Sequence, residues 1–141
     1  MSRENVELWR ETVEGFLRDS ESGWEAWLAR IAEILDPAVE WDASEVAIPG
    51  LVGVFRGKEE VIRWWREWLD AWETVEFEYE LLDAGERVVM LLDQRMRGRS
   101  TGIEVPMGKY AHLATFKDGL LVHWKGYADQ SKALEAAGLS E

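Results

Sequence analysis

The 141-residue sequence has no cysteine and only two histidines, His112 and His123. Without cysteine the chain forms no disulfide and offers neither a thiol nucleophile nor a thiolate ligand for a metal. The two histidines stand at positions of opposite strand alternation, so they do not make a ligand cluster. We therefore expect no metal site and no cofactor.

Positive charge is also scarce, with 16 Lys and Arg against 28 Asp and Glu, which gives a formal net charge of −12. A nucleic-acid binder needs a basic surface, and an anionic membrane would repel this chain. No apolar run approaches the roughly 20 residues that span a bilayer. The start "MSRENVELWRE" is too charged for a signal peptide. We expect a cytoplasmic protein with no nucleic-acid or membrane partner.

Hydrophobic residues are plentiful, at 47% of the chain, and nine of them are tryptophans. The length suits one domain, which we place at residues 1–141. Tryptophan combines a large apolar surface with one N–H donor, so it suits cores and the walls of apolar pockets. The composition thus predicts a single globular domain rich in aromatic packing.

Hydrophobic periodicity predicts helices before strands. Apolar side chains at helical spacing begin at Val6 and again at Trp24, and Pro37 is expected to end the second helix. A short strand (38–41), a loop (42–57) and a helix (58–72) follow. Period-two strands are expected at 74–83, 86–99, 104–117 and 119–128, with a last helix at 130–138. Helices that precede an antiparallel meander indicate an α+β fold, in which three helices on a curved sheet leave a cone-shaped cavity.

Several phrases resemble the nuclear transport factor 2-like superfamily, in its SnoaL-like (polyketide cyclase-like) branch. They are "SRENVELWRETVEGF", "ILDPAVEW", "GLVGVFRGKEEVIRWWREWLDAW", "DAGERVVMLLDQRMRGRSTG", "KYAHLATFKDGLLVHWKGYAD" and "ALEAAGL". The resemblance implies a cone-shaped curved antiparallel sheet wrapped by three N-terminal helices, an apolar pocket for a small apolar molecule, and a homodimer through the sheet. This fold hosts isomerases, dehydratases, cyclases, epoxide hydrolases and non-catalytic binding proteins, so it does not fix the function.

The strand "KYAHLATF" holds the first candidate site residues. Period two places Gly108, Tyr110 and His112 on one face. In the ketosteroid isomerases of the superfamily an oxyanion-stabilising acid corresponds to His112, and in its epoxide hydrolases pocket residues correspond to Gly108 and Tyr110. The resemblance therefore implies that the face of Tyr110 and His112 is turned toward the pocket.

Asp93 and Arg95 lie two residues apart on the preceding strand and share a face. They resemble, in reversed order, an inward Arg-x-Asp pair of limonene epoxide hydrolases. The third acid of those enzymes falls on Gly126, and the isomerase base falls on Trp41, so neither mechanism carries over. Hairpin geometry around "RSTG" predicts that Asp93 lies close to Tyr110.

We predict a catalytic group of His112, Asp93, Arg95 and Tyr110. His112 would transfer a proton, Asp93 would orient it, and Arg95 and Tyr110 would polarise the substrate. The predicted substrate-binding residues are Trp41, Trp124, Phe16, Val39, Trp65, Trp68 and Leu91. Two plainer interpretations stay open, a structural role for His112 and an internal ion pair of Asp93 with Arg95.

The function predicted from these residues is cofactor-free acid–base catalysis of the isomerase, dehydratase or cyclase type. Its substrate would be a small, mostly apolar molecule with a carbonyl or hydroxyl group. One alternative is a non-catalytic binding protein with the same pocket. Another is an epoxide hydrolase with a non-standard Asp/Arg/His site. His123 is expected to face outward, and the facing of Asp42 stays open.

Overall fold

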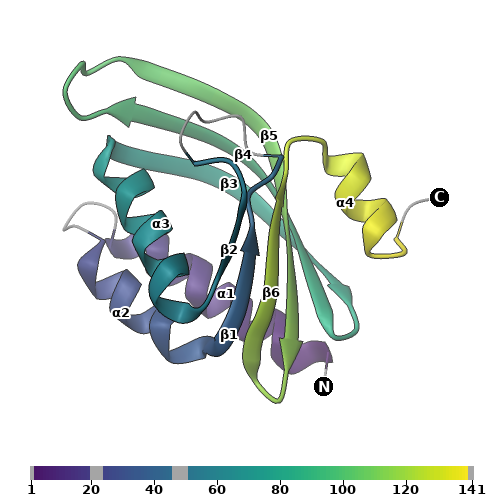
Figure 1. The fold of residues 1–141 in the computed structure, drawn as a ribbon. Coiled ribbons are helices and arrows are strands. Elements are labelled where there is room, and N and C mark those ends of the chain that lie inside the picture. The colour runs from purple at the N-terminus through teal and green to yellow at the C-terminus, as the bar shows by residue number, and fades with distance from the viewer. Residues whose placement is uncertain (1, 20–23, 46–50, 140–141) are drawn as a thin grey trace.

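A strongly curved sheet holds three helices in its hollow, and a fourth helix lies on its other side (Figure 1). The computed structural model describes residues 2–19, 24–45 and 51–139. The elements in chain order are α1 (Ser2–Asp19), α2 (Glu25–Ile34), β1 (Leu35–Asp42), β2 (Val54–Arg56), α3 (Lys58–Asp70), β3 (Trp72–Ala84), β4 (Arg87–Gly98), β5 (Glu104–Lys117), β6 (Leu120–Tyr127) and α4 (Gln130–Ala136).

The six strands form one sheet in the order β2-β1-β6-β5-β4-β3. Four of the neighbouring pairs are antiparallel, whereas β1 and β6 run parallel. The predicted α+β class is confirmed, but the sheet is mixed rather than wholly antiparallel. The reason is topological, because the meander β3–β6 returns its last strand alongside β1 in the same direction.

Two predicted boundaries differ from the structure near the start of the sheet. β1 begins at Leu35 and contains Pro37, and its register against β6 jumps between Leu35 and Glu40. Pro37 therefore lies where ladder pairing is interrupted, which is the place a strand tolerates a residue without an N–H. Within the predicted loop, Val54–Arg56 pairs with β1 as the three-residue strand β2, too short to show a period.

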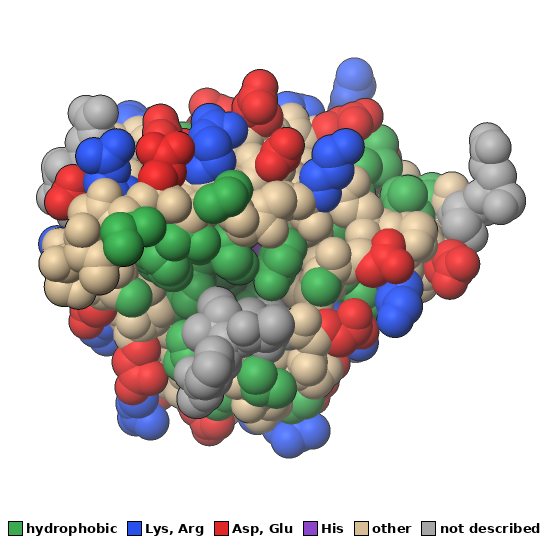
Figure 2. Space-filling model, turned by 90° about the horizontal axis from the view of Figure 1, so that it is seen from above, with side chains coloured by type: hydrophobic (Ala, Val, Ile, Leu, Met, Phe, Trp, Pro, Cys, Tyr) green, Lys and Arg blue, Asp and Glu red, His purple; other side chains and the backbone are tan. Residues whose placement is uncertain are grey.

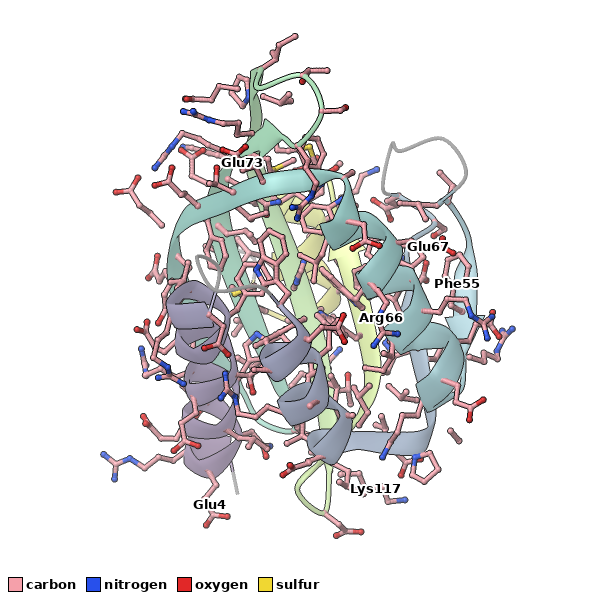
Figure 3. The ribbon with its side chains drawn as sticks, turned by 90° about the vertical axis from the view of Figure 1, so that its left-hand side faces the viewer. Glu4, Phe55, Arg66, Glu67, Glu73 and Lys117 are labelled. Atoms are coloured by element: carbon pink, nitrogen blue, oxygen red, sulfur yellow. The ribbon has the colours of Figure 1, made fainter. Side chains whose placement is uncertain are left out.

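The helices α1, α2 and α3 cover the concave face (Figures 1 and 3). Their buried apolar residues pack with those of the sheet in the larger core. In α3 the buried residues are Val61, Trp64, Trp65, Trp68 and Leu69. Arg66 points away from the sheet, and its guanidinium donates two hydrogen bonds of 3.1 Å to Glu25 of α2 (Figure 3). Amphipathic spacing thus turns the tryptophans inward and joins neighbouring helices through surface charges.

The helix α4 packs on the convex face of the sheet. Its Ala133, and Ala137 just after its end, belong to a small cluster that includes Val89 and Leu113. Asp129 caps the helix by accepting a hydrogen bond from the Ser131 amide at 2.9 Å. This side of the sheet therefore has a small hydrophobic core of its own, separate from the larger core on the concave side.

A β-bulge interrupts the pairing of β5 with β4. Arg95 pairs with Pro106 and Gln94 with Gly108, which leaves Met107 without a partner across the ladder. Gly108 has φ of +78°, a left-handed conformation that suits glycine. Since one extra residue reverses the alternation, the bulge brings Met107 and Tyr110, three residues apart, to the same side of the sheet.

Among the described residues, no helix has both the length and the apolar character that spanning a membrane requires.

Candidate functional site

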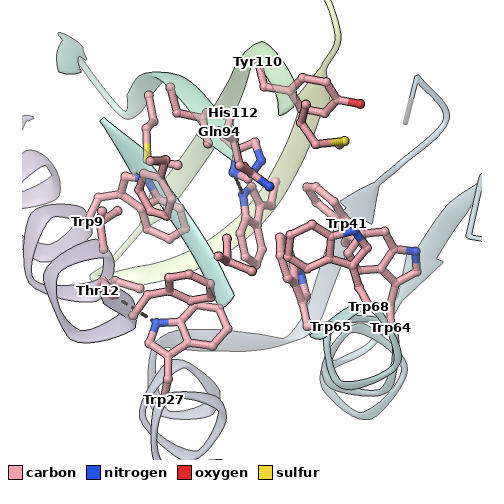
Figure 4. Close-up of a pocket in the computed structure, with 18 residues that line it drawn as sticks. Trp9, Thr12, Trp27, Trp41, Trp64, Trp65, Trp68, Gln94, Tyr110 and His112 are labelled. Carbon is pink, nitrogen blue, oxygen red and sulfur yellow. Dashed lines mark hydrogen bonds between the residues drawn. The ribbon is translucent and has the colours of Figure 1, made fainter. Parts of the chain in front are cut away.

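A pocket lies between the three helices and the concave face of the sheet (Figure 4). It holds about 670 Å³ of empty space, including the part of its mouth that is open to solvent. Hydrophobic side chains gather around a hollow on the face seen in Figure 2. The lining residues are Trp9, Thr12, Val13, Phe16, Trp27, Trp41, Trp64, Trp65, Trp68, Val75, Phe77, Met90, Leu92, Gln94, Met107, Tyr110, His112 and Trp124.

The pocket wall is aromatic and uncharged. Seven of the nine tryptophans belong to it, and none of the described residues that line it is Asp, Glu, Lys or Arg. Its polar side chains are Thr12, Gln94, Tyr110 and His112 beside the indoles. The Thr12 hydroxyl donates to the Leu8 carbonyl at 2.9 Å within α1. Such a wall favours an uncharged, largely apolar ligand, because an ion would lose its hydration without gaining a counter-charge.

His112 lies in the aromatic part of this wall, with only 9% of its surface exposed. Its ring centroid is 5.7 Å from that of Trp41, 6.2 Å from Trp65 and 5.8 Å from Trp124. The Trp124 indole Nε1–H donates a 3.2 Å hydrogen bond to His112 Nδ1. His112 is therefore both enclosed by aromatic rings and fixed by a polar contact.

His112 is a neutral imidazole at neutral pH. Burial disfavours the charged form and lowers the pKa of His112 from 6.5 to about 4. The hydrogen bond from Trp124 acts in the same direction, since an indole N–H only donates and needs an unprotonated Nδ1. The neutral ring carries one proton, and Nε2 is the ring nitrogen that the Trp124 hydrogen bond leaves free.

Several indole N–H groups of the wall are left without an acceptor. Within residues 2–19, 24–45 and 51–139, the buried Nε1 atoms of Trp9, Trp41, Trp65 and Trp68 have no hydrogen-bond partner. The Nε1 of Trp27, by contrast, donates to the Thr12 carbonyl at 3.0 Å. Buried donors are usually satisfied, so four unmet donors in one wall are unusual.

Gln94 is a pocket residue that the sequence analysis missed. It is 7% exposed, and its amide nitrogen lies 3.2 Å from the Met96 sulfur, a weak acceptor. It lies on β4 with Met90 and Leu92, all on the concave face. The even-numbered residues of β4 are mostly apolar, which indicates a buried face, and Gln94 belongs to this face. This pattern could have identified it.

The structure brings seven of the predicted site residues to the pocket wall. They are His112, Tyr110, Trp41, Trp124, Phe16, Trp65 and Trp68. Val39 is fully buried but belongs to the core and not to the pocket lining. Its carbonyl accepts the Gly57 amide at 2.8 Å, beside the start of α3. Val39, predicted to bind substrate, therefore shares the inward face of Trp41 but is a core residue and does not line the pocket.

The predicted inward facing of Asp93, Arg95 and Leu91 is wrong. Asp93 is exposed on the convex face. Its partners in the strand ladder are Glu78 of β3 and Lys109 of β5. Arg95 lies 4.0 Å from Glu78 and has 43% of its side chain exposed. Leu91 packs against the cluster under α4. None of the three contributes to the pocket wall.

The bulge in β5 explains this error. A regular hairpin continued from Arg97–Glu104 would place Leu91 opposite Tyr110, on the pocket face. The extra residue Met107 shifts the register by one, so that Leu92 stands opposite Tyr110 instead. Pro106 and Gly108 within one strand were the available signal, because both residues mark bulges.

The remaining candidates lie on the convex face. His123 Nε2 is 3.2 Å from Glu40, and its side chain is 39% exposed, which confirms its outward facing. Asp42 also faces away from the pocket, with its carboxylate bonded to Ser44 and 3.7 Å from the Lys125 ammonium. In the part of the chain that the structure describes, no three His, Asp or Glu side chains gather as a metal site requires.

The other missed wall residues come from the helices and from the strands β3, β4 and β5. Trp9 and Val13 belong to the predicted apolar stripe of the first helix, and Trp27 to that of the second. Helical periodicity identified these residues as buried. It could not distinguish core residues from pocket-lining residues, because both kinds lie on the apolar side of a helix that faces the sheet.

Comparisons with known proteins agree with the fold. The family model of the SnoaL-like domain matches residues 21–124. No curated protein matches the chain. A nuclear transport factor 2-like protein of unknown function from Burkholderia pseudomallei is 25% identical, with a TM-score of 0.72, over 93% of this chain and 95% of that chain.

Two further solved structures are similar in fold. One, from Jannaschia sp. CCS1, is assigned to the SnoaL-like polyketide cyclases, with 16% identity and a TM-score of 0.69 over 96% of this chain and 94% of that chain. The other, from Catenulispora acidiphila, has a ketosteroid isomerase-like fold and was solved with trimethylamine. It is 14% identical, with a TM-score of 0.65, over 92% of this chain and 93% of that chain. Since the family match spans well over half of the sequence, the chain belongs to the SnoaL-like domain family.

Proposed function

We propose that the pocket binds a small, uncharged and mostly apolar molecule that carries a carbonyl or hydroxyl oxygen. The observation that carries the proposal is a wall of 18 described residues without a charged side chain, in which neutral His112 and Gln94 are buried polar groups. Aromatic and aliphatic side chains supply the apolar contact area, and a few polar groups give orientation.

Binding is the function that the geometry supports best. Proton abstraction needs a base whose pKa lies near the working pH. The pKa of His112 lies near 4, and no carboxylate is found among the described residues that line the pocket. The predicted partners Asp93 and Arg95 face the other side of the sheet. An epoxide hydrolase built on Asp93, Arg95 and His112 therefore has no support in the geometry.

A cofactor-free isomerase, dehydratase or cyclase is the second candidate, favoured by His112 itself. A neutral imidazole N–H in a dry pocket can stabilise an oxygen on which negative charge develops, as in enolisation. In this role His112 polarises the substrate carbonyl, and it does not carry the proton as the sequence analysis predicted. The family fold includes isomerase- and cyclase-like members, which agrees with this chemistry.

The test is calorimetric titration of the wild-type chain with small aryl ketones, and chromatography of the same mixtures after long incubation. Saturable binding without product would support the binding protein, and product that depends on His112 would support the enzyme. Leu92→Trp should fill the pocket and abolish binding, whereas Asp93→Trp, one residue away on the convex face, should bind normally. Equal binding by wild type and Leu92→Trp would place the ligand elsewhere.

A further inference from the structure

We propose that Trp124 fixes His112 in the tautomer with hydrogen on Nε2, and that the pocket therefore selects neutral ligands whose oxygen accepts a hydrogen bond. The tautomer follows from contacts within the chain. The ligand class deepens the proposed function and rests on it. Trp124 is in this sense a positioning residue, acting on the ligand through His112.

The first step is the contact between the two side chains. Trp124 Nε1 lies 3.2 Å from His112 Nδ1, and indole nitrogen has a hydrogen to donate and no lone pair to accept one. If Nδ1 carried a hydrogen, the N–H groups of Trp124 and His112 would point at one another with no acceptor between them. Gly126 stands directly opposite His112 in the ladder, so the nearest inward side chain on β6 is that of Trp124.

The second step is the position of Trp124, which is held by other aromatic rings. Its ring stacks on Trp65 at 4.7 Å with an interplanar angle of 13°, and it meets Trp9 edge-on at 5.2 Å. It is 2% exposed. Packing of this kind leaves the indole little freedom to turn, so its N–H keeps pointing at Nδ1.

The third step is the balance of donors and acceptors in the wall. His112 offers Nε2–H to the pocket, whereas the unmet indole Nε1 atoms of Trp9, Trp41, Trp65 and Trp68 are buried and present almost no surface to a ligand. A ligand with an acceptor oxygen pairs with this N–H, whereas a hydrocarbon of the same shape leaves it unpaired. A conjugated ketone or a quinone has this character.

The fourth step excludes an anion as the preferred ligand. Carboxylates also accept hydrogen bonds, but a buried carboxylate needs a cation nearby. No Lys or Arg belongs to the described wall, and the chain as a whole carries a net charge of −12. The neutral carbonyl is therefore the acceptor that fits.

The tautomer is tested without any ligand. Chain labelled with ¹⁵N at histidine is examined by long-range ¹H–¹⁵N correlation at neutral pH, with His123 as the second signal in the spectrum. We expect His112 as a single Nε2–H tautomer. A Nδ1–H form, or a mixture of both tautomers, would overturn the assignment to Trp124.

The ligand class is tested with three probes of similar size: acetophenone, ethylbenzene and benzoate. Binding is followed by the indole N–H signals of the nine tryptophans. We expect acetophenone to bind about threefold to tenfold more tightly than ethylbenzene, the range that one neutral hydrogen bond gives, and benzoate to bind more weakly than acetophenone. Equal binding of ketone and hydrocarbon, or tighter binding of benzoate, would contradict the proposed ligand class.

The role of Trp124 is tested by Trp124→Phe, which keeps an aromatic ring and removes the N–H. We expect the ¹⁵N spectrum of Trp124→Phe to show both tautomers of His112, and the preference for acetophenone over ethylbenzene to decrease. Trp24→Phe is the matched control, because the buried Trp24 indole lies outside the wall and has no hydrogen-bond partner among the described residues. An unchanged preference in Trp124→Phe would show that Trp124 does not position His112.

These results separate the two proposals. If none of the three probes shifts a wall signal, the proposed binding function fails for this ligand size, and the tautomer measurement still decides the role of Trp124. If the probes bind and the ketone is not preferred, the binding function stands and the ligand class is wrong.

Discussion

At the scale of single residues, His112 shows how surroundings change the chemistry of a side chain. In water an imidazole titrates near neutral pH and can move protons. In this protein the rings of Trp41, Trp65 and Trp124 surround His112 and it is buried. Burial disfavours its charged form, so the ring acts as a neutral hydrogen-bond donor. The residue type suggests acid–base catalysis, and the enclosure favours hydrogen bonding.

The burial of His112 predicts a pH-dependent stability. The pKa of His112 is about 4 in the folded chain and about 6.5 in the unfolded chain, so the unfolded state binds more protons between these values. The free energy of unfolding should therefore fall by about 3 kcal/mol as the pH falls from 6.5 to 4, with the full contribution present above 6.5. Urea unfolding at a series of pH values measures it.

The matched variant for this measurement is His112→Asn, whose side-chain oxygen can still accept the Trp124 N–H but does not titrate. Each protein is compared with its own stability at pH 8, so the lost ring contacts cancel. We expect a smaller decrease toward pH 4 in the variant. Identical pH profiles would mean that His112 is not the group responsible.

At the scale of elements, the bulge in β5 decides which side chains reach the pocket. It places Met107 on the same side as Tyr110 and sets Leu92, not Leu91, opposite Tyr110. Gln130 of the C-terminal helix adds a second constraint at this point, since its amide donates to the carbonyls of Leu92 at 3.3 Å and Tyr110 at 2.9 Å. The pairing of Leu92 with Tyr110 is thus also held from the side of the sheet on which α4 lies.

Gly108→Ala should destabilise the chain through the backbone of this bulge. A Cβ at position 108 would meet no heavy atom within 4 Å, so the expected cost is conformational, from φ of +78°. We expect a loss of about 1–2 kcal/mol in the free energy of unfolding by urea, and a smaller loss for Gly108→Asn, which tolerates this conformation better. Equal stability of wild type and Gly108→Ala would contradict the bulge.

Neighbouring substitutions on β4 test which face is which. Leu92→Ala removes a buried wall side chain, so we expect it to cost about 2–5 kcal/mol and to weaken ligand binding. Asp93→Ala alters an exposed residue of the convex face and should change stability by less than about 0.5 kcal/mol, with binding intact. A loss of binding in Asp93→Ala alone would restore the inward facing that the sequence suggested.

At the scale of the whole molecule, the predicted homodimer through the sheet stays a prediction, as do the cytoplasmic location and the absence of nucleic-acid and membrane partners. The convex face is covered in part by α4. Beside it lie charges of both signs, among them Glu78, Asp93, Arg95 and Lys109. Two copies related by a twofold axis could pair such charges across an interface.

Light scattering over a range of concentrations tests the dimer. We expect a mass twice the 16.2 kDa of one chain. If the interface uses the charged strip, the dimer should weaken in high salt, because salt screens exposed charges. A mass of one chain at every concentration would contradict the prediction.

The sequence by itself determined the features that depend on local pattern. Apolar spacing indicated the helices that cover the sheet, period two placed Tyr110 and His112 on one face, and the family resemblance turned that face inward. These inferences hold because they need no knowledge of how one strand is registered on the next.

Only the tertiary structure decided which partners His112 meets. A single bulged residue reverses the face of a whole strand, so Asp93 and Arg95 lie outside although their own alternation was recognised correctly. Trp124 reaches Nδ1 from another strand, across a position occupied by glycine. The chemistry of the pocket follows from these long-range pairings, because burial and hydrogen bonding determine whether an imidazole acts as a base or as a donor.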